Sequence, residues 1–154
     1  MPKEKMLVEA IQNGIVLDHI PADKLFAIVS LLRLQQLTTP VTIGNNLQSA
    51  RQQRKGVIKL SDHKVSSREL DKIALIAPEV HLNRIQDYEV IEKRQVELPH
   101  EVYDLARCPN PKCITNAEPM RTHFHVATRP EDGTVILECH YCGRKTPAEQ
   151  AELL

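Results

Sequence analysis

The sequence predicts an α+β fold in two parts, an N-terminal ferredoxin-like split βαβ domain and a small C-terminal all-β domain. The first two-thirds of the chain alternates apolar strand-like runs with helical segments and contains no cysteine. The last third holds all four cysteines, in two tight pairs within turn-rich sequence. With 154 residues, 42% of them apolar, the chain is long enough for two small domains if something besides apolar burial stabilises the smaller one.

The N-terminal domain begins with a predicted strand, a helix and two further strands. The run 14–20 is apolar, rich in branched residues and bounded by glycine and proline, as strands are. Pro21 occupies a position favoured in the first turn of a helix. Strands are also predicted at 41–43 and 57–60, with the polar loop 48–56 between them. Seven residues give the helix a broad apolar face: Leu25, Phe26, Ile28, Val29, Leu31, Leu32 and Leu34.

A second helix and a hairpin complete this domain. The helix begins at the capping-box sequence Ser66-Ser-Arg-Glu69 and ends before Pro78. Strands follow at 80–85 and 88–92, joined by the turn residues Gln86-Asp87. The order strand, helix, strand, strand, helix, strand is that of a split βαβ fold, here with an extra terminal strand. Such a fold packs two helices on one face of an antiparallel sheet and leaves the other face available.

The cysteines form the pattern Cys108-Pro-Asn-Pro-Lys-Cys113 and Cys139-His-Tyr-Cys142. Each pair can present two thiolates from one turn, and two such turns make a tetrahedral four-thiolate site of the kind that binds Zn²⁺. A closed set of four thiolates leaves no open coordination position. The pattern therefore predicts one structural zinc ion per chain, held by Cys108, Cys113, Cys139 and Cys142.

Two alternatives for the cysteines are a pair of disulfides and a site in which histidine replaces one thiol. Disulfides suit short secreted proteins, but residues 1–6 are charged, no long apolar run follows, and residues 1–107 contain no cysteine to bridge. We therefore expect a cytoplasmic protein with no membrane-spanning segment. His123, His125 and His140 lie close to the cysteines in sequence, which keeps the histidine alternative open.

The domain boundary is predicted at Leu98-Pro99-His100, which gives an N-terminal domain of residues 1–98 and a C-terminal zinc domain of residues 99–154. The C-terminal part contains the alternating segments 123–126 and 134–137 around Asp132-Gly133, a hairpin dipeptide. A β module of this size is marginal alone. Zinc coordination supplies on the order of 10–16 kcal/mol of apparent free energy to such modules, so the metal and the fold are expected to depend on each other.

Charge and motifs weigh against two other classes of protein. Twenty basic residues balance twenty acidic ones and there are only five aromatic residues, so neither an electrostatic nor a base-stacking surface for nucleic acid is predicted. No catalytic nucleophile motif or glycine-rich phosphate loop is visible. A nucleic-acid-binding zinc ribbon and a small ferredoxin-like enzyme remain the alternatives. The ribbon would use these residues: Arg121, His123, Phe124, His125 and Arg129.

Polar residues gather near the ends of the predicted strands. Asp18 and His19 close the first strand, Lys59 lies in the third, and Lys93 follows the last. Each alone is more often a solvated or locally bonded side chain. Together they resemble a pocket in which lysine charges meet phosphate and an aspartate meets an amino or hydroxyl group.

An ordered series of sequence blocks carries a family resemblance. The blocks are Val8-Glu-Ala-Ile11, Gly14-x-Val16-x-Asp18-His-Ile-Pro21, Thr42-Ile-Gly44, Asn46-Leu47, Ala77-Pro78, Asn83-Arg-Ile85, Tyr88-Glu-Val90, Cys108-Pro-Asn110, Cys113-Ile114, Glu118-Pro119 and Cys139-x-Tyr141-Cys142. In this order they resemble the regulatory subunit of aspartate carbamoyltransferase over essentially the full chain.

The resemblance implies a non-catalytic subunit of an enzyme of pyrimidine biosynthesis. Its N-terminal domain would bind CTP as inhibitor and ATP as activator, with UTP acting beside CTP in some members. Its C-terminal zinc domain would dock on the catalytic chain. Family members pair through their N-terminal domains, and three such dimers bridge two catalytic trimers.

The resemblance also implies a nucleotide site. Asp18 and His19 would lie near ribose and phosphate, Lys59 near ribose and base, and Lys93 at the triphosphate. Four positions would read the amino group of the base through backbone carbonyls: Glu9, Ala10, Ile11 and Tyr88. Four more would form apolar walls: Val8, Val16, Ile85 and Val90. Two further pocket positions are Asn83 and Lys5, the latter associated with a second nucleotide.

One position departs from the family pattern. Known members carry an arginine two residues after the phosphate lysine, where this chain has Gln95, and its own arginine is Arg94. Side chains alternate along a strand, so Arg94 should point to the opposite face from Lys93 unless a bulge intervenes. No role is assigned to the loop 48–56.

Overall fold

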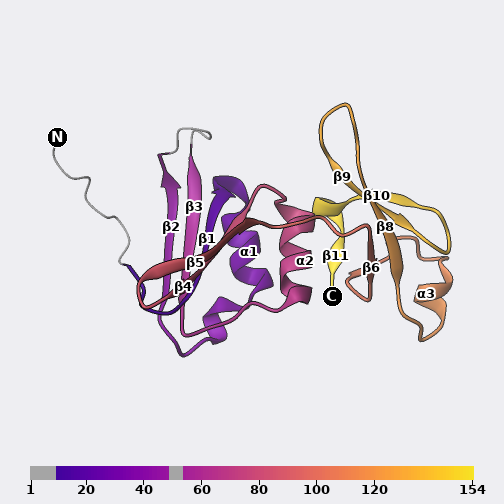
Figure 1. Ribbon diagram of the computed structural model, residues 1–154. Helices are drawn as coiled ribbons and strands as arrows, with labels where there is room; N and C mark the ends of the chain where they lie inside the picture. Colours follow the sequence, from indigo (N-terminus) through magenta and orange to yellow (C-terminus); the bar gives the residue numbers. More distant parts are fainter. Residues whose placement is uncertain (1–9, 49–53) are drawn as a thin grey trace. The chain divides into compact units, whose positions relative to one another are not determined.

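The computed structural model of the chain describes residues 10–48 and 54–154 (Figure 1). By its internal contacts the chain divides into two compact units. The first consists of residues 1–73 and 77–96, and the second of residues 74–76 and 97–154. Most of the loop 48–56 lies outside the described residues.

The first unit is a five-stranded antiparallel sheet with two helices on one side (Figure 1). The strand order β2-β3-β1-β4-β5 is that of a split βαβ fold with β5 added at one edge, as the sequence predicts. The elements are β1 (Gly14–Pro21), α1 (Leu25–Leu31), β2 (Val41–Leu47), β3 (Lys55–Ser61), α2 (Ser67–Ile76), β4 (His81–Gln86) and β5 (Glu89–Gln95).

Alternation along β1 divides the sheet into a buried face and a polar face. Ile15 and Leu17 are buried, and Leu17 pairs across the sheet with Ile58 on β3 and Leu82 on β4, both also buried. Gly14, Val16 and Asp18 point to the other face because successive side chains on a strand alternate. The helices cover the buried face, so neither of them lies over the polar one (Figure 1).

The first helix is shorter than its apolar pattern predicts. Pro21 belongs to β1, and a 3-10 turn (Ala22–Lys24) precedes α1. The helix ends at Leu31 because Arg33 adopts a left-handed conformation, with φ of 52°. Leu34 begins a separate 3-10 turn (Leu34–Gln36) and is still buried, whereas Phe26 is 66% exposed. The apolar residues that were predicted to form one buried helix face are therefore divided between the core and the surface.

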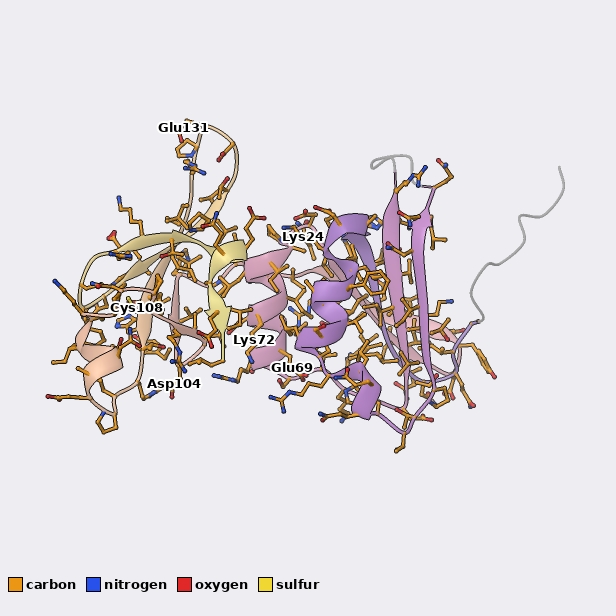
Figure 2. All side chains as sticks on the ribbon, turned by 180° about the vertical axis from the view of Figure 1, so that it is seen from behind. Lys24, Glu69, Lys72, Asp104, Cys108 and Glu131 are labelled. Atoms are coloured by element: carbon orange, nitrogen blue, oxygen red, sulfur yellow. The ribbon has the colours of Figure 1, made fainter. Side chains whose placement is uncertain are left out.

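The second helix begins at the predicted capping box. The hydroxyl of Ser66 accepts a hydrogen bond from the backbone N–H of Glu69 at 3.1 Å, and the carboxylate of Glu69 accepts one from the N–H of Ser66 at 2.9 Å. Glu69 marks this end of α2 in Figure 2. Two backbone donors that have no partner inside the helix are thereby satisfied.

The β4–β5 hairpin turns one residue later than predicted. Asp87 and Tyr88 both have positive φ, 51° and 68°, as the central residues of a type I′ turn require. Tyr88 therefore lies in the turn and not in a strand, and it is 64% exposed. A bulge follows at Ile91, where the register shifts between the pairs Ile85–Val90 and Arg84–Glu92.

The second unit is mostly β structure, with a four-stranded antiparallel sheet in the order β10-β9-β8-β6 and a two-stranded ribbon of β7 and β11. The predicted segments 123–126 and 134–137 form most of β8 and β9. The elements are β6 (Glu101–Tyr103), β7 (Ala106–Arg107), α3 (Ile114–Ala117), β8 (His123–Thr128), β9 (Val135–Cys139), β10 (Lys145–Pro147), a 3-10 turn (Ala148–Gln150) and β11 (Glu152–Leu153). Phe124 and Leu137 are central to its core.

Replacing Ser66 by alanine should lower the free energy of unfolding by about 1 kcal/mol, because the N–H of Glu69 loses its acceptor. Urea denaturation followed by circular dichroism measures this. Ser67→Ala, one residue further on, leaves the capping box in place and serves as the control. An equal loss of stability in both variants would contradict a specific role for the cap.

Candidate functional site

The four cysteine sulfurs converge in the second unit. Their Sγ atoms all lie within 4.8 Å of one another, with Cys108 and Cys142 at 3.6 Å and Cys113 and Cys139 at 3.7 Å. All four are free thiols, with no disulfide between them. Cys108, Cys113 and Cys139 are buried, and Cys142 is exposed. Figure 2 labels Cys108 within this unit. The two disulfides considered from the sequence are not formed.

The turn between the first two cysteines is held by side chains that the sequence did not single out. The amide of Asn116 donates to the carbonyl oxygens of Cys108 and Asn110, each at 2.8 Å. The N–H of Cys113 donates to the carbonyl of Asn110 at 3.0 Å, and the hydroxyl of Thr115 lies 3.2 Å from the Cys113 sulfur. A single side chain of α3, that of Asn116, thus holds the turn closed.

The second pair of cysteines lies at the end of β9. The N–H of Cys139 donates to the carbonyl of Arg144 at 2.9 Å, and the N–H of Gly143 donates back to the carbonyl of Cys139 at the same distance. Gly143 has a φ of 77°, in the left-handed region that glycine occupies at little cost. The turn brings Cys139 and Cys142 to one side of the chain.

The sulfur geometry fits a tetrahedral cation. Four sulfurs held at about 2.3 Å from a central ion lie about 3.8 Å apart, close to the separations observed. Without an ion the thiols cannot all ionise. Burial and the neighbouring thiols raise the pKa of Cys108 to about 12. At Cys142 burial acts in the same direction, but the N–H of Arg144 and nearby hydrogen bonds lower the pKa to about 6. A bound cation would remove this conflict.

A row of polar and apolar side chains crosses the uncovered face of the first unit. Lys59, Val16, Asn83 and Lys93 are direct cross-strand partners on β3, β1, β4 and β5. Side chains paired in this way point to one face. Three strand spacings separate the two lysines, roughly 14 Å along the sheet. The row therefore places one cation at each end of an elongated surface.

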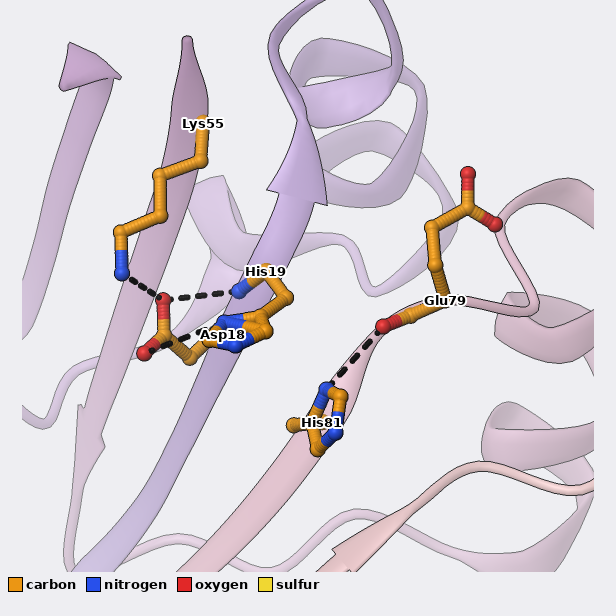
Figure 3. Close-up of polar contacts among 5 residues, drawn as sticks. All are labelled: Asp18, His19, Lys55, Glu79 and His81. Carbon is orange, nitrogen blue, oxygen red and sulfur yellow. Dashed lines mark hydrogen bonds and ion pairs between the residues drawn. The ribbon is translucent and has the colours of Figure 1, made fainter. Parts of the chain in front are cut away.

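Asp18 lies on the same face, within a small polar cluster (Figure 3). Its carboxylate is 2.9 Å from the Lys55 ammonium, accepts the N–H of His19 at 2.7 Å and lies 3.6 Å from the His19 ring. The ring centroids of His19 and His81 are 4.4 Å apart. Partial burial alone would raise the pKa of Asp18, but these hydrogen bonds and the charge of Lys55 outweigh it and lower the pKa below its usual value.

A register shift in β1 lies beside this cluster. Leu17 pairs with Ile58, whereas Ile20 pairs with Gly56, so β1 carries one extra residue between these pairs. His19 takes up the irregularity with a φ of 58°. Lys55 lies four residues before Lys59 on β3, so alternation along the strand puts it on the same face as Lys59 and Asp18. The sequence assigned it no role because the strand was predicted to begin at Val57, which left Lys55 in the loop.

Two groups of the row are partly buried. Burial lowers the pKa of Lys59, and the charge of Asp18 opposes that effect. The buried Oδ1 atom of Asn83 has no hydrogen-bond partner among the residues that the structure describes. A buried acceptor without a donor is costly, and a ligand that donates a hydrogen bond would satisfy it.

The structure brings some of the other predicted residues to this face. Ile85 and Val90 are cross-strand partners beside the row, and Val90 is 55% exposed. Ala10 and Ile11 precede β1 outside regular structure. Three predicted positions lie outside the described residues: Lys5, Val8 and Glu9.

Arg94 does not share the face of Lys93. The pairs Asn83–Lys93 and Leu82–Arg94 are consecutive and regular, because the bulge in β5 lies earlier, at Ile91. Arg94 instead makes an ion pair with Glu92 at 3.1 Å on the opposite side of the strand. Gln95 shares the face of Lys93 and donates to the carbonyl of Pro78 at 2.8 Å.

None of the helices within the described residues is both long and apolar enough to cross a membrane.

Comparison with known proteins matches both units. Residues 6–97 match the family described as aspartate carbamoyltransferase regulatory chain, allosteric domain, and residues 100–152 match the metal binding domain of the same chain. Aspartate carbamoyltransferase regulatory chains from three bacteria illustrate the similarity. That of Porphyromonas gingivalis is 56% identical over 154 residues, which covers all of both chains. That of Phocaeicola vulgatus is 48% identical, over 99% of this chain and 96% of the relative. That of Neisseria gonorrhoeae is 39% identical, over 92% of each.

Two family matches that together span nearly the whole sequence, and relatives of this identity over 92% or more of their length, agree with the two units and the cysteine cluster. The chain therefore belongs to the family of aspartate carbamoyltransferase regulatory chains.

Proposed function

We propose that this chain, a non-catalytic regulatory subunit, binds nucleoside triphosphates on the uncovered face of its N-terminal sheet and thereby controls a catalytic chain of aspartate carbamoyltransferase in pyrimidine biosynthesis. CTP and ATP are the proposed effectors, and UTP is the third nucleotide to test beside CTP. The observation that carries the proposal is the row Lys59–Val16–Asn83–Lys93 with Asp18 beside it.

The row has the chemistry that a nucleotide needs. Lys93 at the exposed edge would meet the triphosphate, since an ammonium is a strong point-charge partner for phosphate. Lys59 and Asp18 would meet the ribose. Val16 and the Ile85–Val90 pair supply apolar contact for a base, and the unsatisfied Asn83 oxygen supplies an acceptor.

The metal is proposed to be one structural Zn²⁺ ion per chain. The four thiols and their spacing support zinc, which favours closed tetrahedral thiolate sites. The zinc-stabilised unit is proposed to dock on the catalytic chain, and the N-terminal units to pair as a regulatory dimer. We propose a cytoplasmic location, where reducing conditions keep four thiols unpaired.

The nucleic-acid alternative loses support from the side chains that it would use. Phe124 is 1% exposed and cannot stack on a base. Arg121 and Arg129 pair with Asp104 and Asp132 at 3.7 and 3.1 Å, so their charges are already partly neutralised. The regulatory function is tested by mixing the zinc-loaded chain with a catalytic trimer and measuring aspartate saturation with and without CTP and ATP. An unchanged curve, with no co-migration of the two chains, would sink the proposal.

Lys93→Ala should abolish the nucleotide response and weaken CTP binding about tenfold or more, because a charged hydrogen bond to phosphate is lost. Assembly with the catalytic chain should remain intact. Arg94→Ala is the matched control, because it removes the same charge one residue away on the opposite face. Calorimetric titration with CTP and gel filtration with the catalytic trimer check both points. Equal weakening in the two variants would place the phosphate elsewhere.

The double variant Arg94→Gln/Gln95→Arg should bind CTP more tightly than the natural chain, by roughly three- to tenfold, since it moves one guanidinium to the face of Lys93 at constant net charge. The same titration measures the gain. The single variant Arg94→Gln should leave affinity unchanged. If the double variant binds no more tightly, the triphosphate does not extend to position 95.

Removing the metal with a strong chelator should unfold the second unit, because coordination supplies on the order of 10–16 kcal/mol to such modules. Amide hydrogen exchange should accelerate at Phe124 and Leu137, while Leu17 and Ile58 in the first unit stay protected. Re-addition of Zn²⁺ to the reduced chain should restore protection. Unchanged exchange at Phe124 after complete metal loss would contradict a structural role for the ion.

A further inference from the structure

Three histidines of the second unit converge on the side of the β8–β9 hairpin opposite the cysteine cluster. His123 and His125 are two residues apart on β8, and His140 follows β9 directly. One ring nitrogen from each lies within 4.8 Å of one from each of the others. Nε2 of His125 and Nδ1 of His140 are 2.9 Å apart.

Strand pairing explains why the two clusters are separate. Phe124 pairs with Cys139, and both are buried on the core side with the thiols. The flanking residues point the other way because side chains alternate along a strand. The N–H of His140 donates to the carbonyl of His123 at 2.9 Å, so the ladder continues one step past β9 and sets these two side by side. Their rings stack with centroids 4.2 Å apart.

A carboxylate completes the surroundings. Glu101 on β6 pairs with His125, and its Oε1 atom lies 2.9 Å from Nε2 of His123 and 3.4 Å from Nδ1 of His125. A carboxylate that accepts the second ring N–H is a regular companion of metal-ligating histidine, because it orients the ring and raises its basicity. The Nε2 atom of His125 is then left to face His140.

We propose that His123, His125 and His140 form a second metal site, separate from the four-thiolate site, which takes a divalent transition-metal ion such as Zn²⁺. Imidazole suits zinc, copper and nickel, whereas magnesium and calcium prefer oxygen ligands. Two nitrogens bound at about 2.0–2.1 Å to a tetrahedral ion lie about 3.4 Å apart, so the His125–His140 pair needs to open by about half an ångström.

Three imidazoles would leave the fourth coordination position open to solvent. Beside His125 lies a cavity of about 590 Å³ whose lining includes Glu138 and Lys145. Glu138 is the cross-strand partner of His125, so a second carboxylate flanks the ring on the side away from Glu101. Lys145 is in turn the cross-strand partner of Glu138, so the negative charge that favours a cation at the histidines comes chiefly from Glu101.

The test loads the full chain with one equivalent of Zn²⁺ to fill the thiolates, then dialyses it against micromolar free Zn²⁺ and measures zinc per chain by elemental analysis. We expect two equivalents for the natural chain. His125→Ala and His140→Ala should each hold one. His100→Ala, which removes an exposed histidine of the same unit that is outside the cluster, should still hold two.

A single equivalent in the natural chain, or a second equivalent that persists in both histidine variants, overturns the proposal. The ring ¹⁵N resonances of the natural chain provide a measurement that needs no substitution. Shifts at all three rings on adding the second equivalent support the site. Unchanged ring resonances overturn it, even if a second ion binds elsewhere.

Discussion

Four thiols packed within 4.8 Å of one another are the constraint on which the second unit depends. As neutral thiols they contribute a small core of weakly interacting sulfur, and as four thiolates they would repel one another strongly. The pKa of Cys108 is raised and that of Cys142 is lowered, which shows that the cluster favours some thiolates but not all four at once. A bound divalent cation would turn the repulsion into attraction and would connect the turn after β7 to the end of β9. Short strands such as β7 and β11, of two residues each, then need little stability of their own.

In the first unit, strand alternation separates the residues of the core from those of the uncovered face. On β1, the residues that build the core alternate with those proposed to bind a ligand. Because successive side chains point to opposite faces, burial of one residue places the next on the uncovered face of the sheet. The register shift near His19 interrupts this order at one point only, beside Asp18, Lys55 and two histidine rings. The polar cluster thus combines regular alternation, which puts Asp18 and Lys55 on one face, with one irregular residue, His19.

The periodicity and spacing of residues predicted those features of the fold that depend on local sequence pattern. The capping box at Ser66 and each of the two cysteine pairs follow from residues close together in sequence, and the strand order follows from the order of the elements along the chain. What failed depended on single backbone conformations. The left-handed residue Arg33 ended α1 early, and a pair of positive φ angles moved the hairpin turn to Asp87 and Tyr88. Lys55 was missed because the strand was predicted to begin at Val57, two residues late, so Lys55 was left in the loop to which no role was assigned. The face of Arg94 could be predicted, since it required only alternation and a regular stretch.

The same alternation gives adjacent residues of one hairpin two unrelated chemistries. Cys139 points into the core with the other thiols, while His140, the next residue, stacks on His123 outside it. A pattern search that treats nearby cysteines and histidines as one ligand set cannot separate these roles, and histidine did remain an alternative for the thiolate site on that basis. Strand pairing separates them. Phe124 and Cys139 are cross-strand partners in the core, so the residues next to them, His123 and His140, point to the other face of the sheet. A ligand set is therefore defined by the face of the sheet to which its members point, and proximity in sequence becomes informative only once the register is known.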